Sequence, residues 1–181
     1  MSHAVPRWEF HATPDPVAGI EAAYQGIHFE HLGSGDPSMN QLLEVRAEGA
    51  ETDYGWQRVL LVTPWVAMRV YLPEDPGDLD GLPEPEELEV EEDGRVRSGC
   101  KVRFPFQGKI YDLEVAYDPR IGHHLVETLL ADMRACEDTE EALHWARIRA
   151  GGGAAEGSES TTKEPRRLSR RDLFRGLLGR R

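Results

Sequence analysis

The segment Val59–Pro73 is the most apolar in the chain, and its residues predict two strands rather than a helix or a membrane span. A membrane helix needs about 20 apolar residues, and this run is shorter and is interrupted by a proline and an arginine. Most of its apolar residues are β-branched or aromatic, which favours strands. Pro64 lacks an N–H donor and favours an extended conformation at the residue before it. We therefore expect two strands, 59–62 and 66–72, joined at a bend next to Pro64.

Helix start signals occur at three places in the chain. The dipeptide Asp15-Pro16 supplies an N-cap and a first-turn proline, and apolar residues then recur at helical spacing over residues 16–31. Asp118-Pro119 repeats the signal and predicts a second helix. Its apolar side would comprise Ile121, Leu125, Val126, Leu129, Leu130 and Met133. Asp138 and Glu141 have the spacing of a capping box and predict a third helix.

Alternating apolar and polar residues predict further strands at 43–47 and 111–117. The pair Asp93-Gly94 suits a tight hairpin turn, so we expect the acidic strand 88–92 to pair with the basic strand that begins at Arg95. The predicted fold class is therefore α+β. It has an antiparallel sheet of about five or six strands, packed by an N-terminal helix and C-terminal helices.

Composition divides the chain into four parts. We expect an N-terminal extension over residues 1–14, one domain over 15–150, a flexible linker over 151–165 and a basic tail over 166–181. The linker is predicted from its low hydrophobicity and its many Gly, Ser, Thr and Glu residues.

Net charge is distributed unevenly along the chain. The formal net charge is −12, of which residues 163–181 contribute +6 and the first 162 residues contribute −18. An acidic body repels nucleic acid and attracts basic peptides or basic protein surfaces, so we expect no nucleic-acid partner. The acidity could equally serve solubility alone.

The sequence offers no constellation typical of catalysis or of metal binding. Cys100 and Cys136 form no disulfide framework, which indicates a reducing compartment, and residues 1–10 lack the apolar core of a signal peptide. The pair His28 and His31 and the set His123, His124 and Glu127 lack the Cys/His framework of a structural zinc site. We expect a cytoplasmic protein that is not an enzyme and holds neither metal nor cofactor.

The basic tail contains a segment that resembles the twin-arginine export motif S-R-R-x-F-L-K, with the Phe and Leu positions exchanged. The residues that carry this likeness are Ser169, Arg170, Arg171, Leu173 and Phe174. The segment is not expected to act as an export signal, because it lies near the C-terminus and only a short apolar stretch follows it. Alternatively, the tail is a short basic amphipathic helix that contacts an anionic membrane surface or a partner.

The central segment and its flanks resemble the HybE/HupJ family of nickel–iron hydrogenase assembly chaperones. Asn40, residues 43–49 and the Thr-Pro-Trp at 63–65 follow the order of the family pattern, which ends in Leu-Pro as here at 72–73. Later Phe-Pro, aromatic and Leu-Gly positions of the family have counterparts at Phe104-Pro105, Tyr111 and Ile121-Gly122. The chain is identified as a divergent member of this family, with the resemblance covering roughly residues 16–135.

The resemblance implies a non-catalytic chaperone that holds a hydrogenase small-subunit precursor, with its twin-arginine signal peptide, before export. Other hydrogenase maturation proteins are further expected partners. The candidate client-binding residues are Thr63, Pro64, Trp65 and Met68. Each of them could equally belong to the core.

Two hypotheses concern the tail. In the first, Ser169–Arg175 mimics the client signal and occupies the same site in the empty chaperone, tethered by the linker at high effective concentration. In the second, the protein is a peripheral membrane adaptor that docks through the basic tail.

Overall fold

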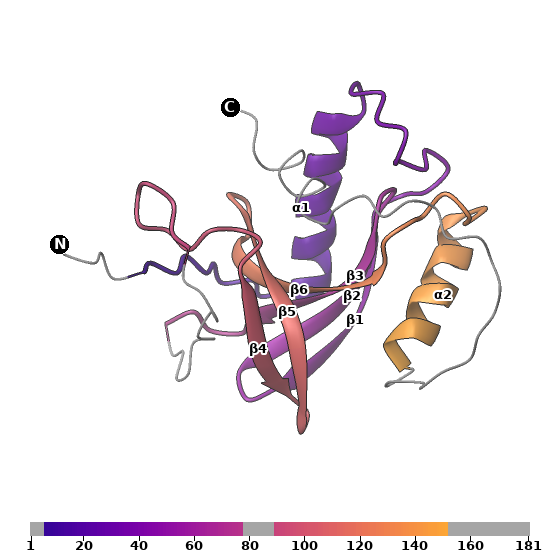
Figure 1. Cartoon of the computed structure of the whole chain (residues 1–181). Helices are drawn as coiled ribbons and strands as arrows, with labels where there is room; N and C mark the ends of the chain where they lie inside the picture. The colour runs from indigo at the N-terminus through magenta and orange to yellow at the C-terminus, as the bar shows by residue number, and fades with distance from the viewer. Residues whose placement is uncertain (1–5, 78–88, 152–181) are drawn as a thin grey trace.

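The structure is a computed structural model of the whole chain and describes residues 6–77 and 89–151 (Figure 1). The elements are α1 (Pro16–His31), β1 (Arg46–Asp53), β2 (Trp56–Val62), β3 (Ala67–Pro73), β4 (Lys101–Phe106), β5 (Lys109–Asp118), β6 (Gly122–Leu130) and α2 (Thr139–Gly151). The strands form one antiparallel sheet in the order β1-β2-β3-β6-β5-β4. The predicted α+β class is confirmed.

The first helix and the central hairpin agree with the sequence prediction. Asp15 caps α1, because its Oδ1 accepts the backbone N–H of Ala18 at 3.1 Å. Strands β2 and β3 pair from Trp56–Pro73 to Val62–Ala67, so the bend at Pro64 is the hairpin turn between them.

The predicted helix after Asp118-Pro119 is wrong, because these residues end β5 and turn the chain into β6. The Asp118 carboxylate accepts the backbone N–H of Arg120 and pairs with its guanidinium, so it holds a turn rather than capping a helix. Leu125 and the next residue, Val126, enter cores on opposite faces of the sheet. A strand buried on both faces has no alternation, which is why its pattern also fitted a helix.

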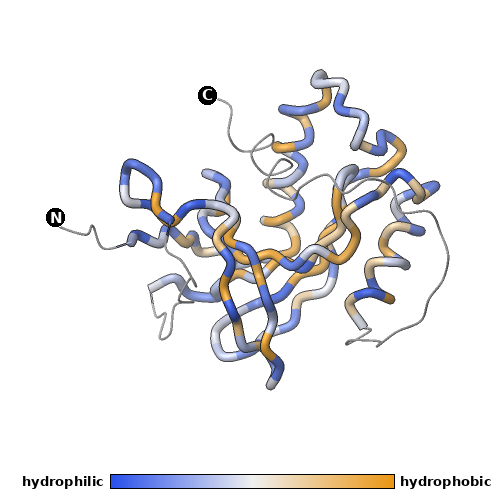
Figure 2. Tube along the Cα trace, viewed as in Figure 1, coloured by the Kyte–Doolittle hydropathy of each residue, from blue (hydrophilic) through white to orange (hydrophobic). Residues whose placement is uncertain are grey.

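Two other strands differ from the prediction in position or in partner. Strand β1 begins at Arg46, and a bulge at Gly49, with φ of 60°, lets it continue to Asp53. Hydrophobic and hydrophilic residues alternate along β4 (Figure 2), which lies in the predicted basic strand. However, β4 pairs with β5, so Lys101 lies opposite Glu114, and the Asp93-Gly94 turn closes only one isolated bridge, between Val90 and Val96.

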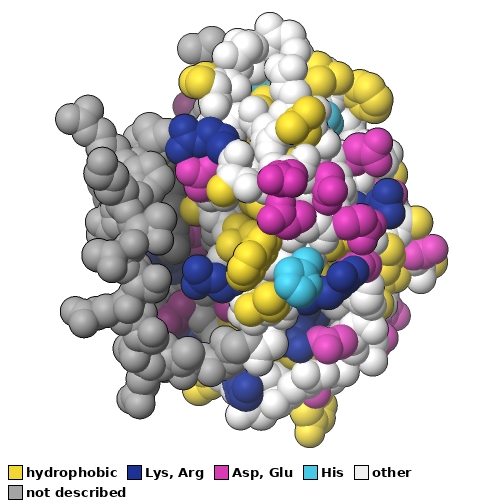
Figure 3. Space-filling view, turned by 90° about the vertical axis from the view of Figure 1, so that its right-hand side faces the viewer, with side chains coloured by type: hydrophobic (Ala, Val, Ile, Leu, Met, Phe, Trp, Pro, Cys, Tyr) yellow, Lys and Arg dark blue, Asp and Glu magenta, His cyan; other side chains and the backbone are white. Residues whose placement is uncertain are grey.

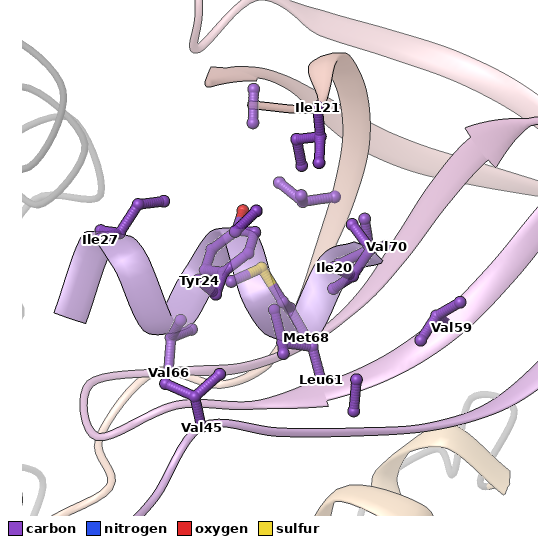
Figure 4. Close-up of a cluster of buried hydrophobic side chains, with 14 of the residues drawn as sticks. Ile20, Tyr24, Ile27, Val45, Val59, Leu61, Val66, Met68, Val70 and Ile121 are labelled. Atoms are coloured by element: carbon purple, nitrogen blue, oxygen red, sulfur yellow. The ribbon is translucent and has the colours of Figure 1, made fainter. Parts of the chain in front are cut away.

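Helices cover both faces of the sheet. On one face, Ile20, Tyr24 and Ile27 of α1 belong to one core with Met68 and its neighbours on the central strands (Figure 4). On the other face, α2 packs its buried residues against Val62, Ala67 and Met133. The buried residues of α2 are Ala142, Leu143 and Ala146.

The sheet is strongly curved, so strands that are far apart in its order meet side by side. The rings of Trp56 on β2 and Phe104 on β4 lie 4.8 Å apart, although three strands separate them in the sheet. The turn between β4 and β5 also reaches β1, since Gln107 donates its backbone N–H to Asp53 at 2.6 Å. This curvature encloses a second core between β2, β3 and β4.

The first described residues lie against the sheet. Phe10 bridges Gly122, and Trp8 stacks on Phe10 with ring centroids 5.3 Å apart. None of the helices in the described ranges is long and apolar enough to cross a membrane. Residues 152–181 lie outside the described residues, and with them the predicted linker after Gly151 and the whole predicted tail.

Candidate functional site

The turn between β2 and β3 brings together the four candidate client-binding residues, and they lie below the surface. Thr63 is fully buried and organises the turn: its Oγ1 accepts the backbone N–H of Trp65 and of Val66 and donates to the Val66 carbonyl at 2.8 Å. Pro64 is buried, Trp65 is 5% exposed, and Met68 packs beneath α1. Their direct contact with a client therefore stays a prediction.

Asn40 fastens the turn to its surroundings. Its backbone N–H donates to the Pro64 carbonyl at 2.8 Å, and its side-chain Nδ2 donates to the carbonyls of Met133 and Cys136 at 3.0 and 2.7 Å. The side-chain Oδ1 accepts the backbone N–H of Leu42 at 3.1 Å. Asn40 thus joins three segments: its backbone holds the central turn, and its side chain holds the loop after α1 and the segment before α2.

Three exposed apolar side chains belong to the end of α1 and the loop that follows it, and we call them the apolar rim: Phe29, Leu32 and Leu42. Phe29 is 72% exposed and stacks on His28, whose ring centroid lies 6.1 Å from that of Trp65. Leu42 is 73% exposed and follows Asn40 by two residues. Phe29 and Leu42 thus lie next to residues that contact the turn, His28 and Asn40.

Carboxylates gather at the beginning of α2, and we call them the acidic cluster: Glu44, Asp132, Glu137, Asp138, Glu140 and Glu141. Glu44 joins the others because its backbone N–H donates to Thr139 Oγ1 at 2.9 Å. The predicted cap is confirmed, since Asp138 Oδ1 accepts the Glu141 N–H at 2.8 Å. The helix dipole stabilises negative charge at this end.

Asp132 of the acidic cluster forms an ion pair, whereas Glu137 and Glu140 remain accessible to a ligand. Arg134 bonds Asp132 and holds the pKa of that carboxyl below its usual value. Within residues 6–77 and 89–151, no basic nitrogen lies within 4 Å of the carboxylates of Glu137 or Glu140. These exposed groups can accept charge-assisted hydrogen bonds from an incoming guanidinium.

A second exposed apolar group, which we call the α2 patch, consists of Trp145 and Ile148. They are 47% and 49% exposed, and the Trp145 indole donates to Glu141 at 3.4 Å. The two residues are three apart on the outer side of α2 and therefore lie on neighbouring turns. Figure 3 shows acidic side chains gathered between two groups of hydrophobic side chains on this side of the molecule.

The two adjacent histidines of β6 are structural groups of the core. His123 Nδ1 accepts the Glu9 backbone N–H at 2.7 Å, so its Nε2–H donates to the Val96 carbonyl. His124 has the opposite tautomer, since its Nδ1 faces the Gly122 carbonyl and its Nε2 accepts from the Tyr24 hydroxyl at 2.8 Å. Burial lowers the pKa of both histidines.

Neither the histidines nor the cysteines assemble a reactive centre among the described residues. No group of three His, Cys, Asp or Glu side chains there could hold a metal ion. Cys100 and Cys136 are both buried, and desolvation raises the pKa of each thiol, which disfavours the thiolate needed of a nucleophile.

The exposed groups of the described surface are suited to binding a partner. Carboxylates beside exposed aromatic and aliphatic side chains form a surface that suits a peptide with arginines and an apolar segment. Neither the apolar rim nor the α2 patch was among the sequence-predicted site residues. The sequence did contain a sign of the apolar rim. Phe29 lies outside the helical spacing of the apolar residues that predicted α1, so its side chain was not expected to face the core.

The chain is similar to a known protein family and to a solved structure. A sequence model described as "[NiFe]-hydrogenase assembly, chaperone, HybE" matches residues 15–176. No curated protein sequence matches the chain. The solution structure of HybE from Escherichia coli has the same fold, with a TM-score of 0.50 at 16% identity, covering 92% of this chain and 98% of that one. Because the family match spans nearly the whole chain, this protein belongs to the HybE family of nickel–iron hydrogenase assembly chaperones, which is a non-catalytic family.

Proposed function

We propose that this chaperone acts in the cytoplasm and binds the precursor of a hydrogenase small subunit through its twin-arginine signal peptide before export. Family membership supports a hydrogenase client. The observation that carries the finer proposal is the position of the acidic cluster beside the α2 patch, where Glu141 accepts the Trp145 indole N–H. Other hydrogenase maturation proteins remain proposed partners.

The two chemical features of such a peptide have separate complements on this surface. The paired arginines meet the acidic cluster, where Glu137 and Glu140 accept hydrogen bonds from their guanidinium groups. The apolar segment of the peptide covers the apolar rim or the α2 patch. Charge attraction speeds the encounter, and apolar contact sets the lifetime of the complex.

A titration of the full chain with a synthetic signal peptide of a nickel–iron hydrogenase small subunit tests the proposal. Saturable binding that weakens with salt is expected, because the arginine contacts are electrostatic. A peptide with both arginines replaced by alanine should bind at least tenfold more weakly. Absence of saturable binding up to millimolar peptide would overturn the proposal.

Charge variants place the contact on the surface. Glu137→Lys/Glu140→Lys reverses two carboxylates that form no ion pair among the described residues, and it should slow association and weaken binding. The matched control is Glu74→Lys/Glu92→Lys, which makes the same charge change at exposed positions outside the acidic cluster. Equal weakening by both pairs would mean that net charge alone attracts the peptide.

A further inference from the structure

The outer side of α2 presents a tryptophan and an isoleucine with nothing described to cover them. Trp145 and Ile148 are each about half exposed, although the opposite side of the same helix is fully buried against the sheet. The acidic cluster begins one turn away, where Glu141 accepts the Trp145 indole N–H. This helix face thus offers apolar and anionic contacts side by side.

We propose that the segment Ser169–Leu178 of the same chain docks on the α2 patch and the acidic cluster and competes there with the signal peptide. The segment has the complementary chemistry. It combines three arginines with four large apolar residues, namely Arg170, Arg171, Arg175, Leu173, Phe174, Leu177 and Leu178. This proposal rests on the proposed function, because it assigns the same surface to the signal peptide and to the segment that competes with it.

The chain between α2 and the segment is long enough for the segment to reach the acidic cluster. The described chain ends at Gly151, the last residue of α2, and 17 residues lie between it and Ser169. A chain of that length with flexible composition spans about 23 Å on average, at roughly 5–6 Å times the square root of the residue number. Helix α2, with 13 residues, is about 20 Å long at 1.5 Å per residue. The arginines therefore reach the acidic beginning of α2.

The family match supports a role for the segment within the chaperone. It extends beyond the described domain to residue 176 and so includes Ser169–Arg175. The charge balance agrees with a contact inside the chain, because residues 163–181 carry +6 whereas the rest of the chain carries −18.

Tethering gives the competition a predictable size. A short linker whose length matches the span holds its ligand at an effective concentration of about 1 mM. If the isolated segment binds with a Kd of about 0.1 mM, the tethered segment lowers the apparent affinity for a signal peptide about tenfold. The client displaces the segment because it brings a longer apolar region.

The test uses the full chain and reads the docking without any client. In a ¹H–¹⁵N spectrum, the indole signal of Trp145, assigned with Trp145→Phe, should shift when Arg170→Glu/Arg171→Glu releases the segment. A synthetic peptide of residues 166–181 should then shift this signal back in the variant. The matched control is Arg180→Glu/Arg181→Glu, with the same charge change outside the segment, which should leave the signal in place.

A second readout separates the proposal from the proposed function. The Arg170→Glu/Arg171→Glu variant should bind the hydrogenase signal peptide about tenfold more tightly than the unsubstituted chain. Signal-peptide binding with an unchanged affinity and an unmoved Trp145 signal overturns the internal docking and leaves the proposed function intact. A Trp145 signal that moves in the variant, without any signal-peptide binding, supports the internal docking and overturns the proposed function. A vesicle experiment tests the membrane alternative. If the unsubstituted chain co-sediments with anionic vesicles, the Arg170→Glu/Arg171→Glu variant does not, and the Trp145 signal is the same in both, then the segment contacts a membrane and the docking on α2 is overturned.

Discussion

Asn40 donates its backbone N–H to the carbonyl oxygen of Pro64 over 2.8 Å, and this bond ties the central hairpin turn to the loop after α1. The Asn40 side chain adds three hydrogen bonds, two of them to buried carbonyls before α2. Asn40→Ala removes the side-chain donor of both carbonyls and leaves the Met133 carbonyl with only the more distant Cys136 N–H, at 3.2 Å, so we expect a loss of about 3 kcal/mol in the free energy of unfolding. Urea denaturation followed by circular dichroism measures it.

Two further variants sharpen this first prediction. Asn40→Asp keeps the size of the side chain but replaces its amide donors with a carboxylate, and it should destabilise the fold at least as much. Gln41→Ala changes the exposed neighbour and should stay within about 0.5 kcal/mol of the unsubstituted chain. A loss below 1 kcal/mol in Asn40→Ala would show that Asn40 does not hold these segments together.

Gly122 occupies a position that has no room for a Cβ atom. It has φ of 72°, and an added Cβ would lie 2.3 Å from the Glu9 carbonyl oxygen, which already accepts the His123 N–H. Gly122→Ala should therefore cost more than about 2 kcal/mol, by adding a backbone clash to the left-handed strain. Gly94 has φ of 81° and open space around it, so Gly94→Ala bears the strain alone. Equal melting temperatures for the two variants would contradict the clash.

The sequence predicted the elements whose signals are local and missed those that depend on tertiary context. The cap at Asp15 and the turn at Pro64 act within a few residues, and both lie where they were expected. Strand β6 was predicted as a helix because Leu125 and Val126 serve two different cores, a fact that no single segment reveals. The partner of β4 was likewise wrong, since pairing is set by the curvature of the sheet.

The candidate site was only partly predictable for the same reason. The sequence located the Thr63–Trp65 turn, but the burial of its side chains depends on α1 and Asn40 folding over it. The exposure of Trp145 is equally non-local. It lies in a helix whose existence was predicted, yet its orientation follows from Leu143 and Ala146 facing the sheet. Sequence periodicity alone did not separate the two sides of such a short helix.

Acid should weaken the fold through His124. Burial lowers its pKa to about 4, whereas the unfolded chain has the ordinary value of 6.5. A depressed histidine pKa means that the unfolded state binds the proton first, so stability is complete above pH 6.5 and is lost as the pH falls toward 4. Between pH 7.5 and pH 5, His124 should account for a loss of about 2 kcal/mol in the free energy of unfolding.

Comparison of variants isolates this contribution from that of the carboxylates and from that of His28 and His123, whose pKa values burial also lowers. His124→Gln removes the titrating group, so its stability should change about 2 kcal/mol less over this pH range than that of the unsubstituted chain. His144→Gln, at an exposed position of α2, should keep the full change. Urea denaturation at pH 7.5 and at pH 5 measures the free energy of unfolding of each variant. If His124→Gln loses as much stability between these pH values as the unsubstituted chain, His124 is not the group responsible.

The two tryptophans near the candidate site should respond in opposite ways to substitution. Trp65 is buried, so Trp65→Ala should cost about 3–5 kcal/mol of folding free energy, whereas the half-exposed Trp145 should cost about 1 kcal/mol or less. Signal-peptide binding should show the reverse order. Trp145→Ala removes an aromatic contact at the proposed surface and should weaken binding about tenfold, as expected for an interface hot spot.

Trp65→Phe provides the decisive contrast, because it keeps an aromatic ring in the core and a thermal melt verifies its folding. Its peptide affinity should match that of the unsubstituted chain, since the apolar rim and α2, rather than the turn, face the ligand. If Trp65→Phe melts normally but loses the peptide while Trp145→Ala retains it, the buried turn opens to contact the client. The turn would then bind as the family resemblance first predicted, and α2 would only support it.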